Sequence, residues 1–117
     1  RHGYNQRHAL VIGTSRLGRR VVDALAQHPE LGVRVHGFLS ADSRKVGERI
    51  DGVPVIGRYD DLQERVRSGI DIVFVCLPPE DEQWAEKMFG LLATTMVEVK
   101  ALIDPAMLIE IEADAVC

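Results

Sequence analysis

The sequence is poor in cysteine, in aromatic residues and in long apolar runs, and each shortage excludes a class of protein. Its 117 residues include two cysteines, Cys76 and Cys117, too few for a disulfide framework. No apolar run is long enough to span a bilayer, so we expect no membrane insertion by this chain. Aromatic residues make up 5% of the chain and no basic stripe accompanies them, which argues against nucleic acid as a partner.

The residues that are present suffice for one folded domain. Apolar residues make up 46% of the chain, and 14 basic residues are interspersed with 18 acidic ones, for a net charge of −4. The chain begins at Arg1 without a methionine and ends at Cys117 with no visible boundary signal. We therefore expect residues 1–117 to be a single domain excised from a longer protein.

The most informative segment is an apolar run followed by a glycine turn and an amphipathic helix, at residues 8–22. This order is typical of the opening of a Rossmann-type nucleotide-binding domain. Gly13 permits a tight turn after the strand, and Gly18 allows the helix to pack closely on the sheet. Ser15 stands where the usual G-x-G-x-x-G pattern has its middle glycine, so a side chain occupies the place where backbone approaches a pyrophosphate.

Two interpretations of this loop remain open. In the first, the helix N-terminus and the Arg16 side chain bind a nucleotide phosphate. The candidate residues are then Gly13, Thr14, Ser15, Arg16, Leu17 and Gly18. In the second, the segment is a strand-turn-helix corner without a ligand, and Arg16 is a solvated side chain.

Alternating apolar runs and amphipathic segments predict an α/β fold of the Rossmann-like kind, with three α/β/α layers and a mostly parallel sheet. Strands are expected at 9–12, 33–39, 50–57, 70–77 and 97–103, and helices at 16–28, 60–69 and 80–93. Pro54 favours an edge or irregular position for the third strand. In the last helix, one apolar stripe is expected to contain Trp84, Met88 and Leu91, beside Ala85, Phe89 and Leu92.

Ligands of such sheets bind at the carboxyl ends of the strands, which adds Ser40, Asp42, Leu77 and Pro78 to the candidates. Ser40 stands where an NAD-binding domain usually has an acid for the ribose hydroxyls, and Asp42 follows two residues later. Arg44 and Lys45 would meet a 2′-phosphate. The alternative is that this segment is a solvated polar loop.

We find no catalytic constellation and no metal site in the sequence. The four histidines, His2, His8, His28 and His36, lack the spacing of a metal-ligand pair. Cys76 lies in an apolar strand and is expected to be a small buried side chain. The acidic run at 80–82 is explained by a helix start, where carboxylates favour the helix dipole.

Several segments in combination resemble a known family. They are Arg1–Arg7 with the glycine loop that follows, Leu31–Leu39, Asp51–Gly57, the helix containing Leu62, and Asp71–Pro78. The chain is similar over nearly its whole length to the central Rossmann-like, CoA-binding-type domain of bacterial polyprenyl-phosphate sugar-1-phosphate transferases. It departs from that family's pattern at Ser15, which replaces a glycine, and at Ser40–Ala41, which replace acids.

The resemblance implies a regulatory or assembly domain without catalytic residues, on the cytoplasmic side of the bacterial inner membrane. The parent enzyme would move a sugar phosphate from a nucleotide sugar onto undecaprenyl phosphate in exopolysaccharide synthesis. The expected ligand is a nucleotide of the NAD(P), UDP or CoA type, and the expected partners are the rest of the parent chain and a second copy. Two alternatives stay open: the NAD(P)-binding part of a sugar-nucleotide dehydratase or oxidoreductase, and a ligand- or redox-sensing module.

Overall fold

The described part of the chain forms one six-stranded sheet with helices on both faces. The computed structural model describes residues 6–81 and 83–101. The strands are β1 (Arg7–Ile12), β2 (Val33–Ser40), β3 (Arg49–Ile50), β4 (Val53–Arg58), β5 (Ile72–Val75) and β6 (Glu98–Ala101). Their order is β3-β4-β2-β1-β5-β6, and every pairing is parallel except that of β3 with β4. The expected α/β architecture is therefore confirmed.

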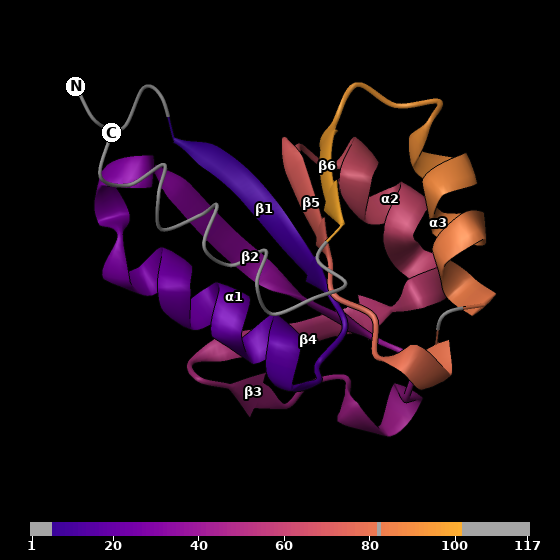
Figure 1. Ribbon diagram of the computed structural model, residues 1–117, viewed down its shortest axis with the longest axis horizontal. Helices are drawn as coiled ribbons and strands as arrows, with labels where there is room; N and C mark the ends of the chain where they lie inside the picture. Colours follow the sequence, from indigo (N-terminus) through magenta and orange to yellow (C-terminus); the bar gives the residue numbers. More distant parts are fainter. Residues whose placement is uncertain (1–5, 82, 102–117) are drawn as a thin grey trace.

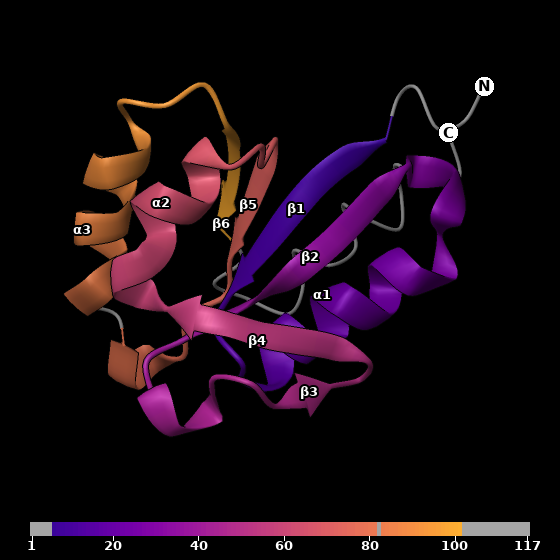
Figure 2. The same ribbon diagram turned by 180° about the vertical axis from the view of Figure 1, so that it is seen from behind.

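Each face of the sheet has its own apolar core. Helix α1 (Arg16–Gln27) lies on one face, and helices α2 (Leu62–Arg67) and α3 (Gln83–Leu92) lie on the other (Figures 1 and 2). Because side chains alternate along β1, Ala9 and Val11 pack in the α1 core, whereas Leu10 and Ile12 pack in the core under α2 and α3. Burial on both faces explains why β1 is a continuous apolar run.

The helix boundaries after the Pro78-Pro79 pair, which follows β5, differ from the sequence prediction. The helix expected from Glu80 begins at Gln83, and Glu80 lies instead in a short 3-10 helix, Pro79–Asp81. The acidic run is therefore not the first turn of a long helix, and Asp81 accepts a hydrogen bond from the Tyr59 hydroxyl. The predicted start of the α-helix was therefore three residues too early, although Glu80 and Asp81 do lie in the first turn of the short 3-10 helix.

Two further expectations hold only in part. Pro54 was expected in an edge or irregular strand: β4 is not at the edge, because it lies between β2 and the two-residue β3, but its pairing with β2 is irregular, with a register shift between Phe38 and Leu39. Proline is tolerated there because the pairing of β4 with β2 begins only at Val55. Along the expected stripe of α3, Met88 and Leu92 are buried and Leu91 is half-buried. Residues 102 and 103 of the last predicted strand lie outside the described residues.

Candidate functional site

The glycine loop lies against the two strands that flank β1. The N–H of Gly13 donates to the carbonyl of Leu39 at 2.9 Å, at the end of β2. On the other side, a Cβ added to Gly13 would lie 2.2 Å from the carbonyl oxygen of Cys76, just after β5. The φ angle of Gly13 is +108°, a value that residues with a Cβ atom rarely adopt. Gly13 therefore meets both the conformational and the steric requirement for which it was singled out.

Among the described residues, the first backbone N–H groups of α1 have no hydrogen-bond partner. Ser15 is the N-cap residue in an extended conformation, and its side chain accepts no capping hydrogen bond from the described residues. The first turn of this helix, all of which is described, contains no acidic side chain, and Arg16 is exposed. Backbone N–H groups and the positive end of the helix dipole suit an anion. The helix start is thus compatible with an anion, and whether the loop binds a phosphate or is a corner without a ligand stays a prediction.

The end of β2 forms a second wall of the site, but its polar groups already have partners. Ser40 is buried, and its Oγ accepts the N–H of Asp42 at 3.0 Å. The Asp42 carboxylate accepts from the Arg44 backbone N–H at 2.9 Å and from Nε and Nη2 of Arg44 at 3.1 Å each. These bonds from Arg44 lower the pKa of Asp42. Asp42 is thus an anion paired with its own neighbour, and ribose hydroxyls would share its oxygens with Arg44.

The segment after β5 is the third part of the candidate site at this end of the sheet. The N–H of Cys76 donates to the carbonyl of Ile12 at 2.8 Å, so the ends of β1 and β5 are held together. Leu77 and Pro78 follow and are half-buried. Burial raises the pKa of the Cys76 thiol to about 12, which keeps it protonated and unreactive. The expectation that Cys76 is a small buried side chain is confirmed.

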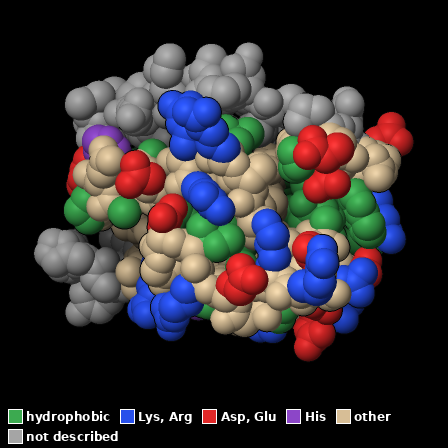
Figure 3. All heavy atoms as spheres, turned by 90° about the horizontal axis from the view of Figure 1, so that it is seen from below, with side chains coloured by type: hydrophobic (Ala, Val, Ile, Leu, Met, Phe, Trp, Pro, Cys, Tyr) green, Lys and Arg blue, Asp and Glu red, His purple; other side chains and the backbone are tan. Residues whose placement is uncertain are grey.

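All the predicted site residues therefore lie at one end of the sheet, because they follow β1, β2 and β5, which are parallel neighbours. Figure 3 looks at this end of the molecule and shows Lys and Arg side chains scattered over it, with Asp and Glu between them. Because the charges are mixed, this end of the molecule has no broad basic surface, and an anion would be bound by individual side chains. Which of these residues touch a ligand remains a prediction.

A polar and aromatic cluster at the same end was not predicted. The Tyr59 hydroxyl donates to Oδ2 of Asp81 at 3.1 Å, and the Tyr59 ring packs edge-on against Trp84 with centroids 5.4 Å apart. Burial, together with the nearby Asp81 carboxylate, raises the pKa of the Tyr59 hydroxyl. The cluster joins the end of β4 to the turn after β5. No sequence signal could reveal it, because Tyr59 and Asp81 are 22 positions apart.

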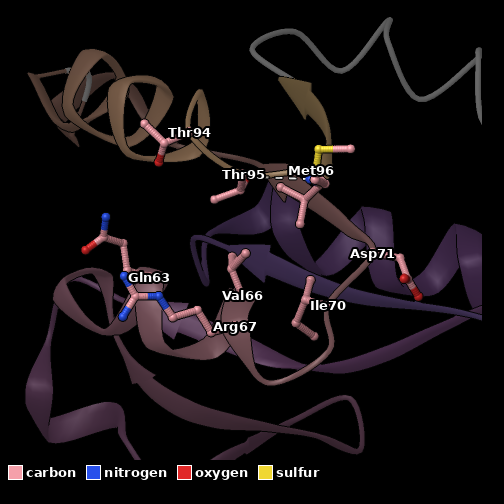
Figure 4. A pocket seen from close by; sticks show the side chains of 9 residues that line it. Gln63, Val66, Arg67, Ile70, Asp71, Thr94, Thr95 and Met96 are labelled. Carbon is pink, nitrogen blue, oxygen red and sulfur yellow. Dashed lines mark hydrogen bonds between the residues drawn. The ribbon is translucent and has the colours of Figure 1, made fainter.

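A cavity of about 420 Å³ lies elsewhere, at the amino ends of β5 and β6. Figure 4 shows its side chains, which come from α2, from the turn before β5 and from the segment between α3 and β6. Val66 and Ile70 contribute apolar surface, and Gln63, Arg67 and Thr94 contribute polar groups. This cavity is at the end of the sheet opposite the glycine loop, so it is not part of the predicted site.

The comparisons with known proteins agree with this fold. A family profile described as a CoA-binding domain matches residues 1–102. The chain belongs to this CoA-binding domain family. The family match confirms the CoA-binding-type domain implied by the resemblance, whereas the sugar-phosphate transferase parent stays a prediction. No curated protein matches the sequence.

Solved structures share the architecture of the domain at low sequence identity. UDP-D-quinovosamine 4-dehydrogenase from Vibrio fischeri is 19% identical with a TM-score of 0.72, and the alignment covers 90% of this chain and 84% of that one. RSP, a Rex-family repressor, is 16% identical with a TM-score of 0.65, and the alignment covers 93% of this chain and 58% of the repressor. The C. glutamicum DAP dehydrogenase is 18% identical with a TM-score of 0.61, and the domain spans 31% of its length. These likenesses establish the Rossmann-like fold.

The domain has no membrane-spanning helix within its described residues, since none of their helices is both long and apolar enough.

Proposed function

We propose that the domain is a non-catalytic nucleotide-sensing and assembly module of a membrane sugar-1-phosphate transferase. The observation that carries the ligand part is the start of α1, where Gly13 and Gly18 bring unpaired backbone donors to the edge of the sheet beside Arg16. Membership of the CoA-binding domain family over residues 1–102 supports a nucleotide-type ligand. The transferase context rests on the family resemblance of the sequence segments.

The expected ligand is an anionic nucleotide held weakly. The helix N-terminus contributes roughly 0.3–1 kcal/mol to a nearby anion, and a hydrogen bond from Arg16 contributes about 1.5–3 kcal/mol. The Ser15 side chain narrows the approach of a pyrophosphate, and Asp42 is occupied by Arg44. Together these effects favour micromolar to millimolar affinity over permanent retention of NAD.

A panel of NAD, NADP, UDP, a UDP-sugar and CoA, measured by thermal shift and calorimetry, tests this proposal. At least one of them raises the melting temperature of the wild-type domain, and Arg16→Ala weakens its binding by roughly tenfold. Arg20→Ala is the matched control, because Arg20 is an exposed cation of the same helix that lies beyond the loop, and its effect is small. Equal losses in the two variants, or recovery of stoichiometric NAD(H) from the purified domain, would overturn the proposal.

The enzymatic part of the proposal has its own test. The pure domain releases no nucleoside monophosphate when it is incubated with nucleotide sugars and undecaprenyl phosphate. Turnover above the buffer control would contradict the non-catalytic assignment.

A second candidate is the cofactor-binding part of a sugar-nucleotide oxidoreductase. The likeness to the quinovosamine dehydrogenase, over 84% of that chain, favours it. The two candidates differ in cofactor preference and in affinity: an oxidoreductase part binds NAD(H) or NADP(H) tightly and in preference to UDP and CoA, whereas the sensing module holds its nucleotide weakly. The same ligand panel therefore separates them.

A further inference from the structure

Two histidines that are remote in the sequence meet on the surface of the sheet. Nε2 of His36, in β2, lies 2.7 Å from Nδ1 of His8, in β1. The ring centroids are 4.7 Å apart, and the ring planes are inclined by 78°. His36 is exposed and His8 is half-buried, so solvent reaches the pair.

An irregularity in the sheet brings the rings together. In the pairing of β1 with β2, Ala9 is opposite Val35 and Leu10 is opposite Gly37, which leaves His36 as an extra residue. Such bulges are uncommon in parallel pairs, and they change the direction of the side chain at the bulge. Here the bulged residue itself is the one whose ring nitrogen reaches His8.

The pair lies at the amino ends of β1 and β2, away from the glycine loop at their carboxyl ends. Two charged groups flank it. Asp71 accepts the backbone N–H of His8 through Oδ2 at 2.8 Å, and Arg34 precedes His36 by two positions in β2. The carboxylate of Asp71 attracts a cation to this region, and the guanidinium of Arg34 opposes one.

We propose that His8 and His36 form a binding site for a divalent transition-metal ion of the zinc class. The ligand atoms are Nδ1 of His8 and Nε2 of His36, and water completes the coordination. The site is independent of the proposed nucleotide function.

The geometry can accommodate such an ion because Zn–N bonds are about 2.0–2.1 Å long, so two imidazole nitrogens on one tetrahedral zinc ion lie roughly 3.3 Å apart. The two nitrogens, which are 2.7 Å apart, therefore need to separate by roughly 0.6 Å, and both rings must rotate so that their lone pairs point at the ion. Without metal, one shared hydrogen joins the two nitrogens. With metal, both nitrogens present lone pairs, and the hydrogens sit on Nε2 of His8 and Nδ1 of His36. Imidazole ligands favour zinc, nickel and copper over magnesium and calcium.

The number of ligands determines what kind of site this is. Within residues 6–81 and 83–101 there is no group of three or more His, Cys, Asp or Glu side chains suited to one metal. A structural zinc site uses four protein ligands. Two histidines with water therefore hold an exchangeable ion, which responds to metal concentration and is not needed for folding.

A zinc titration of the whole 117-residue chain by calorimetry tests the site. It is done in a His2→Ala background, because an α-amino group next to a histidine can chelate metal by itself. One equivalent of Zn²⁺ binds, and the imidazole NMR signals of His8 and His36 shift together. His8→Ala and His36→Ala each weaken binding by roughly tenfold or more. Mg²⁺ at the same concentrations causes no shift.

Two further variants make the result specific. His28→Ala is the matched control: the His28 ring contacts Glu30, away from the pair, so zinc binding is unchanged. Arg34→Gln removes the nearby positive charge and tightens zinc binding about twofold or more. His36→Gln, with circular dichroism of every variant, separates loss of a ligand from loss of the fold. Absence of saturable binding up to millimolar zinc, or binding in the His8→Ala and His36→Ala variants as tight as in the protein that keeps both histidines, would refute the site.

Discussion

Gly18 of α1 lies directly on Gly13 of the loop that precedes the helix: a Cβ added to Gly18 would be 2.2 Å from the carbonyl oxygen of Gly13. The first turn of the helix is thus packed against the strand-to-helix turn with no room for a side chain. This contact fixes the direction of α1 and, with it, the direction of the unpaired N–H groups at its start.

Alanine substitution at either glycine is therefore expected to destabilise the domain. Gly18→Ala forces the helix away from the loop, and Gly13→Ala adds a clash with the Cys76 carbonyl in a positive-φ conformation. Each change lowers the free energy of unfolding by about 1–3 kcal/mol or more, as measured by urea denaturation. Gly90→Ala is the control, because a Cβ there meets nothing within 4 Å, and it raises stability by about 0.5–1 kcal/mol. Unchanged stability of Gly18→Ala would contradict the packing described.

Tyr59→Phe tests the connection between the end of β4 and the turn after β5. The change removes the hydrogen bond to Asp81 and leaves a well-packed ring, so the free energy of unfolding falls by about 1 kcal/mol. Tyr59→Ala also removes the contact with Trp84 and costs more. If Tyr59→Phe is as stable as the wild type, the hydroxyl contributes no net stability.

The same hydroxyl predicts a loss of stability at alkaline pH. Burial and Asp81 raise the pKa of Tyr59 in the folded state. Above the ordinary tyrosine pKa of about 10, the unfolded chain gives up the phenolic proton while the folded chain retains it. The unfolded state then binds fewer protons, so stability falls as pH rises. Urea denaturation of a Tyr4→Phe protein from pH 8 to 11 measures this fall, and Tyr4→Phe/Tyr59→Phe shows a smaller one.

Asp42→Asn is expected to change NAD affinity by less than about twofold. The carboxylate accepts hydrogen bonds from the backbone and guanidinium of Arg44, which therefore competes with the ribose hydroxyls for its oxygens. Calorimetry at millimolar NAD measures the effect, with Arg16→Ala as the variant that does weaken binding. A tenfold loss in Asp42→Asn would instead show that Asp42 contacts the ribose.

The domain is expected to form a homodimer through α3. Phe89 is 38% exposed on this helix, beside the half-buried Trp84. The Pro54-containing strand lies inside the sheet and offers no open edge for a second copy. Phe89→Glu gives a monomer in light scattering at high micromolar concentration. Val46→Glu changes an apolar side chain of similar exposure, 43%, outside α3 and leaves the dimer intact. A monomeric wild-type domain would refute the prediction.

The predictable parts of the candidate site are those encoded by neighbouring residues. The strand-glycine-helix order of residues 8–22 predicted the loop correctly, because a buried strand, a positive-φ turn and a helix stripe are each local patterns. The pairing of Asp42 with Arg44 is also local, two positions apart, and the spacing could have revealed it. Parallel neighbours then predicted that Gly13, Ser40 and Leu77 share one end of the sheet.

Contacts between distant segments could not be read in this way. Tyr59 and Asp81 meet because β4 and β5 end on the same side of the sheet. His8 and His36 meet because of a bulge at His36, which the residues next to it in the sequence do not indicate. Local hydrophobic patterns therefore specified the layers, the parallel sheet and the glycine loop. The spacing of apolar residues identifies each strand and helix, and their alternation along the chain implies the layered parallel sheet. The partners of the ionisable side chains were set by strand order and register, which arise only when elements far apart in the sequence pack together.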